Sequence, residues 1–433
     1  MAEVRYRWRC RPSTPRRKPA LPTAPAPHPE PPLSDAPSPP PRAPRALGRV
    51  PALDGVRGLA VAAVLAFHLR PLGLFGGGWL GVEVFFVLSG FLITTLLLEE
   101  IGRTGRLSFR RFYARRALRL QPALIAFVAV WLVVLAVAHD RFWFSSVPSF
   151  PINRHATVPL AVGLRGAATT LGQVNNWLSA YHHDPGPIGQ VWSLSIEWQF
   201  YLVWPALLLV LLRLGRRPAL AGTVLALAAS AVAAAALYRH GLGDNRVYFG
   251  TDTQAQALLA GAVAAQLLHA GRLDRLLRRR RWPLVATAAG LVLGGLAVLL
   301  SHGDSWRAHG GFVVIELAAA VVVVTLAGRR GVGERLLTWE PLAYLGRRSY
   351  AVYLWSYVLA TWFHSLGAWQ LPLTVAASLG AAEASWRVVE RPALRLKRRF
   401  EPGGADGATE PGGADGERQQ PAARDNVLSR AAP

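Results

Sequence analysis

About ten long apolar stretches constrain the fold of this chain more than any other feature of its sequence. A helix needs about 20 mostly apolar residues to cross the roughly 30 Å hydrocarbon core of a bilayer. Hydrophobic residues make up 52% of the sequence and charged residues only 17%, whereas soluble domains carry about 25% charged residues. The sequence therefore predicts an all-α, polytopic membrane helix bundle. The expected spans are 52–70, 78–98, 122–139, 192–212, 219–238, 252–269, 282–300, 310–327, 341–362 and 371–390.

The formal net charge of +23 raises the question of a nucleic-acid partner, but the positions of the arginines indicate a membrane orientation signal instead. With residue 1 inside the cell, the expected inner loops are rich in arginine, as cytoplasmic loops are. These loops are 99–121, 213–218, 270–281 and 328–340, which hold seven, three, six and three basic residues. The outer loops contain more residues and together hold about six basic ones. We therefore expect both termini in the cytoplasm, a multi-pass protein of the plasma membrane, and no nucleic acid as a partner.

The two ends of the chain have the composition of linkers. Residues 1–48 are rich in proline and arginine, and residues 396–433 contain the sequence Glu-Pro-Gly-Gly-Ala-Asp-Gly twice. Both segments are too poor in bulky apolar residues to form a core, so we expect them to be disordered and cytoplasmic. Residues 49–395 form the expected membrane domain. The only cysteine, Cys10, lies in the first linker, so the sequence offers no disulfide framework and no thiolate metal site.

Two ionisable residues share the first expected span. Arg57 and His68 are eleven residues apart, close to three helical turns, so their side chains fall on one face about 16 Å apart along the axis. Ionisable groups at membrane depth are costly and are read as functional by default. The arginine is a permanent cation, whereas the histidine gains or loses a proton near neutral pH. The alternative is that His68 only forms a hydrogen bond to a neighbouring helix.

A series of motifs follows the chain from this span to the last one. They occupy 53–68, 81–93, 112–122, 192–201, 248–253, 345–350 and 389–392. In this order they resemble the motifs of the membrane acyltransferase-3 family, whose first helix carries an Arg-x10-His signature. The resemblance covers roughly 49–395 and implies an integral-membrane enzyme that moves an acyl group from cytoplasmic acyl-CoA to an acceptor, often a sugar hydroxyl. No esterase-like domain follows the last expected span, so we expect the stand-alone form.

The resemblance and the expected topology together assign the inner arginines to the acyl donor. Arg57 begins the first span on the inner side, and Arg115, Arg116 and Arg119 lie in the inner loop before the third span. Arg116 and Arg119 are three residues apart and share a helical face. Guanidinium groups suit phosphate recognition, so the four arginines are candidates for binding the pyrophosphate and 3′-phosphate of CoA. The alternative, strongest for Arg115, is that they are ordinary positive-inside anchors.

On the outer side, we expect His68 to converge with the three carboxylates of Glu83, Glu197 and Asp252. Each carboxylate falls in the first turns of a helix that enters the membrane from outside. His68 would take the proton from an acceptor hydroxyl as that hydroxyl attacks the thioester carbonyl. Glu83 would hold the ring tautomer and stabilise the imidazolium. Glu197 and Asp252 are candidate acceptor ligands, with a structural role as the alternative for both.

Other polar and aromatic residues complete the expected site. Trp192 and Tyr248, from two of the motifs, are further candidates for the acceptor side. The long outer loop, 139–191, is a candidate acceptor lid, although its aromatic residues suit an interfacial belt equally well. Its two adjacent histidines lack a third ligand at a helical spacing, so we expect no bound metal. Glu316 and Glu383 lie in apolar runs outside the motifs, and we expect them to pair with arginines.

The leading hypothesis is an integral-membrane O-acyltransferase that transfers an acyl group, with acetyl preferred, from acyl-CoA to a hydroxyl of a glycan or glycosylated metabolite. Acyl-CoA is then a co-substrate, and no bound cofactor is expected. Two departures from the family leave the acceptor open: Ser356 follows Tyr-Leu-Trp where many members have histidine, and Gln190 and Val191 precede the Trp-Ser-Leu motif. A proton-coupled transporter of an acyl donor or lipid-linked sugar is the alternative, and a non-catalytic subunit is a third possibility.

Overall fold

The computed structural model describes residues 48, 50–69, 74–138, 160–183, 188–239, 243–300, 310–328 and 333–397. Every regular element in this part of the chain is a helix, which confirms the predicted all-α class. The two expected terminal linkers and much of the expected lid lie outside the described residues.

The main helices are α1 (Pro51–Leu69), α2 (Leu80–Thr104), α3 (Phe109–Ala138), α4 (Leu160–Leu171), α5 (Asn175–Ala180), α6 (Trp192–Arg213), α7 (Arg216–Arg239), α8 (Gly243–Phe249), α9 (Thr251–His269), α11 (Trp282–Leu299), α12 (Gly311–Gly328), α14 (Glu340–Arg347), α15 (Ser349–Trp362) and α16 (Gln370–Ser385). Short turns complete the series: η2 (Gly189–Val191), α10 (Asp274–Leu277), α13 (Glu334–Leu337), η4 (His364–Trp369), η5 (Trp386–Glu390) and α17 (Arg391–Lys397).

Seven helices in the described part of the chain are long and apolar enough to cross a membrane. They are α1, α2, α3, α6 with the preceding η2, α7, α11 and α12. The other three expected spans are also helical, and each departs from a simple span. Helix α9 buries three glutamines, the expected span 341–362 divides at Arg348 into α14 and α15, and α16 has only 16 residues. Buried polar side chains and a helix break both lower the apolar length on which the prediction depended.

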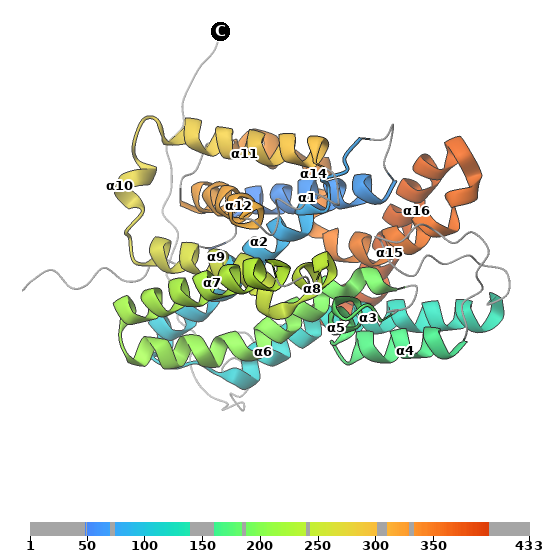
Figure 1. The fold of residues 1–433 in the computed structure, drawn as a ribbon, viewed down its shortest axis with the longest axis horizontal. Helices are drawn as coiled ribbons and strands as arrows, with labels where there is room; N and C mark the ends of the chain where they lie inside the picture. Colours follow the sequence, from blue (N-terminus) through green and yellow to red (C-terminus); the bar gives the residue numbers. More distant parts are fainter. Residues whose placement is uncertain are drawn as a thin grey trace, which may run out of the picture. The chain divides into compact units, whose positions relative to one another are not determined.

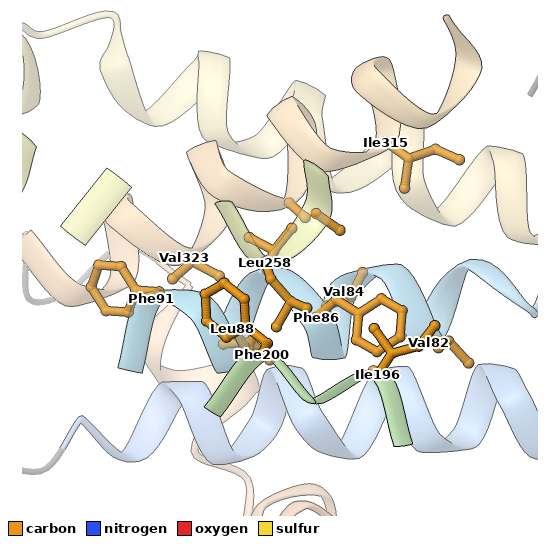
Figure 2. Packing of buried hydrophobic residues seen from close by; sticks show 14 of the residues in the cluster. Val82, Val84, Phe86, Leu88, Phe91, Ile196, Phe200, Leu258, Ile315 and Val323 are labelled. Atoms are coloured by element: carbon orange, nitrogen blue, oxygen red, sulfur yellow. The ribbon is translucent and has the colours of Figure 1, made fainter. Parts of the chain in front are cut away.

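Helix α2 is the central helix of the bundle. In the most apolar 18-residue stretch of α2, 83% of the residues are buried, against 11% in the corresponding stretch of α11. Helix α2 packs on α1, α6, α9 and α12. Figure 2 shows Phe86 and Phe91 of α2 among side chains of α6, α9 and α12, including Leu258 and Val323. Away from this core, α3 pairs with α4, and α11 pairs with α12 on the other side of the bundle (Figure 1).

Glycines allow the closest helix crossings. A Cβ on Gly90 of α2 would overlap the backbone carbonyl of Leu258 in α9, and a Cβ on Gly261 of α9 would overlap that of Val87 in α2. Small residues let membrane helices approach to backbone contact, which is what this reciprocal pair does. Gly346 in α14 approaches the backbone of α1 in the same way. The crossing holds the junction between α14 and α15 beside the first turns of α1, where the candidate site begins.

Candidate active site

A cavity of about 800 Å³ lies among α1, α2, α3, α6 and α15. Apolar side chains of α2 form one of its walls, and charged side chains form much of the rest. The charged residues that line it are Arg57, Arg116, Arg119 and Arg347, together with Asp54, Glu197 and Glu390. The volume falls within the range of small-molecule sites, roughly 300–1,000 Å³. We call this space the arginine cavity. Its lining suits a ligand with a strongly anionic part and an apolar part.

Three of the four predicted donor arginines meet in the arginine cavity. Arg57 comes from α1, and its guanidinium lies 3.7 Å from the Asp54 carboxylate one turn earlier. Arg116 and Arg119 come from α3, and each interacts electrostatically with Arg57. The Arg116 guanidinium also lies 5.7 Å from the centre of the Tyr201 ring. The three guanidinium groups carry like charges that repel one another, so an anion placed between them would be strongly favoured.

The fourth predicted donor residue, Arg115, is not among the residues that line the arginine cavity. It donates a hydrogen bond to the Glu100 carboxylate of α2 at 2.7 Å, and the same carboxylate accepts the backbone N–H of Ser108 at 3.0 Å. Consecutive residues on a helix are rotated by about 100°, so Arg115 and Arg116 face different neighbours. Arg115 therefore joins α3 to the end of α2, and its role in donor binding stays a prediction.

Glu197 also lies in the arginine cavity, whereas we expected it at the level of His68. Its carboxylate accepts a hydrogen bond from Tyr201 at 3.3 Å and interacts electrostatically with Arg57 and Arg116. Helix α6 begins at Trp192, so Glu197 is about 7 Å further along the axis from the start of the helix. That depth brings the carboxylate to the cations instead of the histidine.

His68 lines a second, much smaller cavity of about 20 Å³, which we call the histidine pocket. Trp192 and Tyr248, both predicted for the acceptor side, line the same pocket, and their ring centres lie 4.9 Å apart. The edge of the Tyr357 ring meets the His68 ring with 4.9 Å between centres. A space of this size holds about one water-sized group. The fold thus brings together His68, Trp192 and Tyr248 from α1, α6 and α8.

The two cavities share part of their wall. Val82 and Tyr353 line both the arginine cavity and the histidine pocket. The Tyr353 hydroxyl donates a hydrogen bond to the backbone carbonyl of Gln190 and lies 2.8 Å from the Ser193 hydroxyl oxygen. The sequence analysis missed Tyr353, because a tyrosine in an apolar span is an ordinary core residue. The only available signal was its place in the Tyr-Leu-Trp segment that precedes Ser356.

Glu83 is fully buried on α2 and is not among the residues that line either cavity. It interacts electrostatically with Glu316 of α12, which is 1% exposed. The prediction that Glu316 pairs with an arginine is therefore wrong for the described residues, while the same prediction for Glu383 is confirmed by an ion pair with Arg387 at 2.7 Å. The role of Glu83 in holding the catalytic imidazole stays a prediction.

Asp252, the remaining predicted acceptor ligand, lies outside both cavities. It accepts two hydrogen bonds from Arg246, at 2.9 and 2.7 Å, and this bonding raises the pKa of the Arg246 guanidinium. The same guanidinium lies 5.2 Å from the Trp177 ring centre and 5.8 Å from that of Tyr181. Because the Asp252 side chain is 46% exposed, the pair remains accessible from the surface.

The described part of the expected lid directs its amides inward. Asn175 and Asn176 of α5 are fully buried. Asn176 donates hydrogen bonds of 3.0 Å to the Phe249 carbonyl and to the Thr251 hydroxyl. These bonds connect α5 to the end of α8, next to Tyr248. The Asn176 amide therefore positions the wall of the histidine pocket, and both amides are buried inside the protein.

These features together define a class of protein: an integral-membrane helix bundle in which a cavity lined by arginines adjoins a pocket lined by a histidine. The chain belongs to the acyltransferase 3 family, whose model, described as an acyltransferase domain, matches residues 50–382.

Relatives with curated names support this assignment. The chain is 32% identical over 363 residues to the peptidoglycan O-acetyltransferase OatA of Listeria monocytogenes, and 34% identical over 367 residues to the putative peptidoglycan O-acetyltransferase YrhL of Bacillus subtilis. It is 30% identical over 363 residues to the O-acetyltransferase OatA of Staphylococcus aureus. Each match covers 79% of this chain but only 55%, 54% and 57% of the respective relative. The chain thus spans about half the length of these curated relatives. No solved structure matches it.

Proposed function

We propose that this protein is an integral-membrane O-acyltransferase that moves an acyl group, acetyl first of all, from cytoplasmic acyl-CoA to a hydroxyl of a glycan. The observation that carries the proposal is the shared wall between the arginine cavity and the histidine pocket. A donor held by its phosphates in the first space would have its reactive end directed toward the second. The names of the relatives support an acetyl group and a glycan acceptor.

The donor side follows from the shape and charge of CoA. Its phosphates are gathered at one end, and its thioester is at the far end of a long, flexible arm. Arg57, Arg116 and Arg119 would bind the phosphates, since guanidinium groups form strong paired hydrogen bonds to phosphate oxygens. The arm would extend along the apolar wall of α2. Arg57 and His68 are about 16 Å apart along the axis of α1, which is comparable to the length of an extended arm.

The chemistry needs one proton acceptor beside the acceptor hydroxyl. In its neutral form His68 would accept the hydroxyl proton while the hydroxyl oxygen forms a bond to the thioester carbonyl carbon. The carbon–sulfur bond then breaks, and the imidazolium returns its proton to the leaving thiolate. The products are an ester and free CoA. Trp192 and Tyr248 would hold the acceptor at the pocket, and Glu83 would act through His68, by orienting its ring, without touching the substrate.

The test compares His68→Gln with wild type in inside-out membrane vesicles of a bacterial host. Radiolabelled acetyl-CoA is added with a native membrane extract and soluble peptidoglycan fragments, and label in base-labile ester is counted. We expect the variant to lose about 10²–10⁴-fold in rate, the usual contribution of a general base. Label that appears only when acetyl-CoA reaches the cytoplasmic face would support the expected orientation.

The matched control is His269→Gln at the end of α9, since His269 lines neither cavity. It should retain the wild-type rate, which would show that removing a histidine from this membrane protein is tolerated. Equal label with wild type and His68→Gln, above an empty-vesicle background, would remove His68 from the chemistry.

One observation favours the alternative of a proton-coupled transporter. Glu83 and Glu316 are neighbouring carboxyl groups buried among membrane-spanning helices, and such groups occur in proton relays. A transporter would lose its activity when a protonophore collapses the proton gradient. Acyl transfer with acyl-CoA supplied on the cytoplasmic side needs no gradient. Ester formation that persists with the protonophore would therefore favour the enzyme.

A further inference from the structure

The arginine cavity and the histidine pocket, which share part of their linings, differ greatly in volume. The first has a volume of about 800 Å³ and the second of about 20 Å³. Val82 and Tyr353 belong to the lining of both. An acyl group that approaches His68 from the donor side would pass from a space with ample room to one that holds about one water-sized group.

The walls of the histidine pocket have little freedom to move apart. Trp79 is 1% exposed, Phe249 is 1% exposed and Trp192 is 4% exposed. Their rings pack on Tyr248, with centre-to-centre distances of 5.9 Å for Trp79, 5.1 Å for Phe249 and 4.9 Å for Trp192. Close-packed interiors respond to added volume with strain instead of a smooth expansion. The pocket would therefore resist an acyl chain longer than its resting size allows.

Tyr353 is held in place in the wall that the arginine cavity and the histidine pocket share. Its hydroxyl is bound to the Gln190 carbonyl and lies 2.8 Å from the Ser193 hydroxyl. All three residues are buried, at 7%, 1% and 5% exposure for Tyr353, Gln190 and Ser193. Rotating the phenol ring away would break both bonds in a buried setting, which is costly. The ring thus forms a fixed part of the wall that the two cavities share, and Val82 forms an apolar part of it.

We infer that Val82 and Tyr353 form the aperture that limits the acyl group delivered to His68 to the length of an acetyl group. This inference rests on the proposed acyl transfer and adds to it the residues that select the acyl chain. The thioester carbonyl would meet the acceptor hydroxyl at the aperture, and the carbon chain beyond the carbonyl would have to fit the histidine pocket. The single methyl carbon of an acetyl group fits there, whereas the three carbons of a butyryl group would press on the aromatic walls.

The test is a competition between acetyl-CoA and butyryl-CoA in the vesicle assay, with the two product esters separated by mass. Wild type should form acetyl ester almost alone. Val82→Ala removes two carbons from the aperture, and Tyr353→Leu removes the ring. We expect each to raise the ratio of butyryl to acetyl ester at least about tenfold, since a single methylene in an apolar pocket is worth 10–200-fold in selectivity.

Val84→Ala is the matched control. Val84 lies two residues further along α2, is buried at 7% exposure and lines neither cavity. It loses the same two carbons and should keep the wild-type ratio. If Tyr353→Leu is not recovered in folded form, the comparison of Val82→Ala with Val84→Ala still tests the inference.

Three results would overturn the inference while leaving acyl transfer intact: an unchanged ratio in Val82→Ala, an equal rise in Val84→Ala, or wild type that uses both donors alike. The absence of any ester with wild type would instead overturn the proposed function itself. The two failures are therefore distinguishable in one experiment.

Discussion

Arg57 and His68 stand on one helix, α1, yet each lines a different cavity. Because a helix is stiff over three turns, the distance between the cation and the imidazole is set by the eleven residues between them. In the proposed reaction α1 therefore fixes the separation between the phosphate end and the reacting end of the donor. The remaining groups need only complete the two ends.

Replacing Arg116 should weaken donor binding. Arg116→Ala removes a guanidinium from the arginine cavity, and a charge-assisted hydrogen bond contributes about 1.5–3 kcal/mol. We expect the KM for acyl-CoA to rise about 10–100-fold, with a smaller change in kcat. Arg115→Ala is the adjacent control, because Arg115 pairs with Glu100 outside the cavity. The measurement is saturation kinetics with acyl-CoA in vesicles. An equal rise in KM for Arg116→Ala and Arg115→Ala would contradict the assignment.

Adding a methyl group at the crossing of α2 and α9 should destabilise the bundle. Gly90→Ala places a Cβ into the Leu258 carbonyl, and Gly261→Ala places one into that of Val87. Overpacking of this kind costs about 1–3 kcal/mol or more. In detergent we expect the apparent unfolding temperature to fall by several degrees. Gly294→Ala on α11, which meets nothing within 4 Å, should leave it unchanged; an equal fall there would contradict the crossing.

Neutralising one member of the buried carboxyl pair should not harm the fold. Glu316→Gln keeps the shape of the side chain and removes a potential charge beside Glu83, so the cost of burying like charges decreases. We expect an apparent unfolding temperature at least as high as that of wild type. Glu383→Gln is the contrast, because it weakens ion pairs to Arg348 and Arg387 and should lower that temperature. Acyl transfer should survive Glu316→Gln; its loss would revive the proton-relay alternative.

The pair between Asp252 and Arg246 should affect the acceptor and not the donor. Asp252→Asn weakens the bidentate bonding that holds Arg246 beside Trp177. We expect the acceptor KM to rise by up to about tenfold, the effect of losing about 1.4 kcal/mol, with the KM for acyl-CoA unchanged. Asp274→Asn, at an exposed position after α9, should change neither constant. A rise in the KM for acyl-CoA in Asp252→Asn would count against an acceptor-side role of Asp252.

The helical spans were largely predictable because a long apolar segment has few other structures open to it in a bilayer. The expected span 252–269 coincides with α9, whereas the expected span 341–362 is divided at Arg348 between α14 and α15. The meeting of His68 with Trp192 and Tyr248 was also expected, but through the family motifs. Helical periodicity alone relates residues on one helix and says nothing about which face of another helix they meet.

The departures from the expected positions have the same physical origin. Glu197 shares the cavity of Arg57 because it lies five residues beyond Trp192, the first residue of α6. The expected span 192–212 has the same start, but it does not show which residues of other helices lie at that depth. Arg115 and Arg116 look alike in the sequence, yet one residue of rotation sends them to different partners. Apart from its place in the Tyr-Leu-Trp segment, Tyr353 carries no sequence signal, because it lies between two spaces that only the assembled helices create.

The buried glutamines of α9 have a consequence for how the protein is made. Gln254, Gln256 and Gln266 are all buried, and Gln266 donates a hydrogen bond of 2.7 Å to Thr223 of α7. A nascent segment with three amides partitions poorly into lipid by itself. Helix α7 precedes α9 during synthesis, so it can offer that partner as α9 leaves the ribosome. We therefore expect α9 to insert into the bilayer together with earlier helices. Correct membrane insertion then depends on the order in which the helices are synthesised.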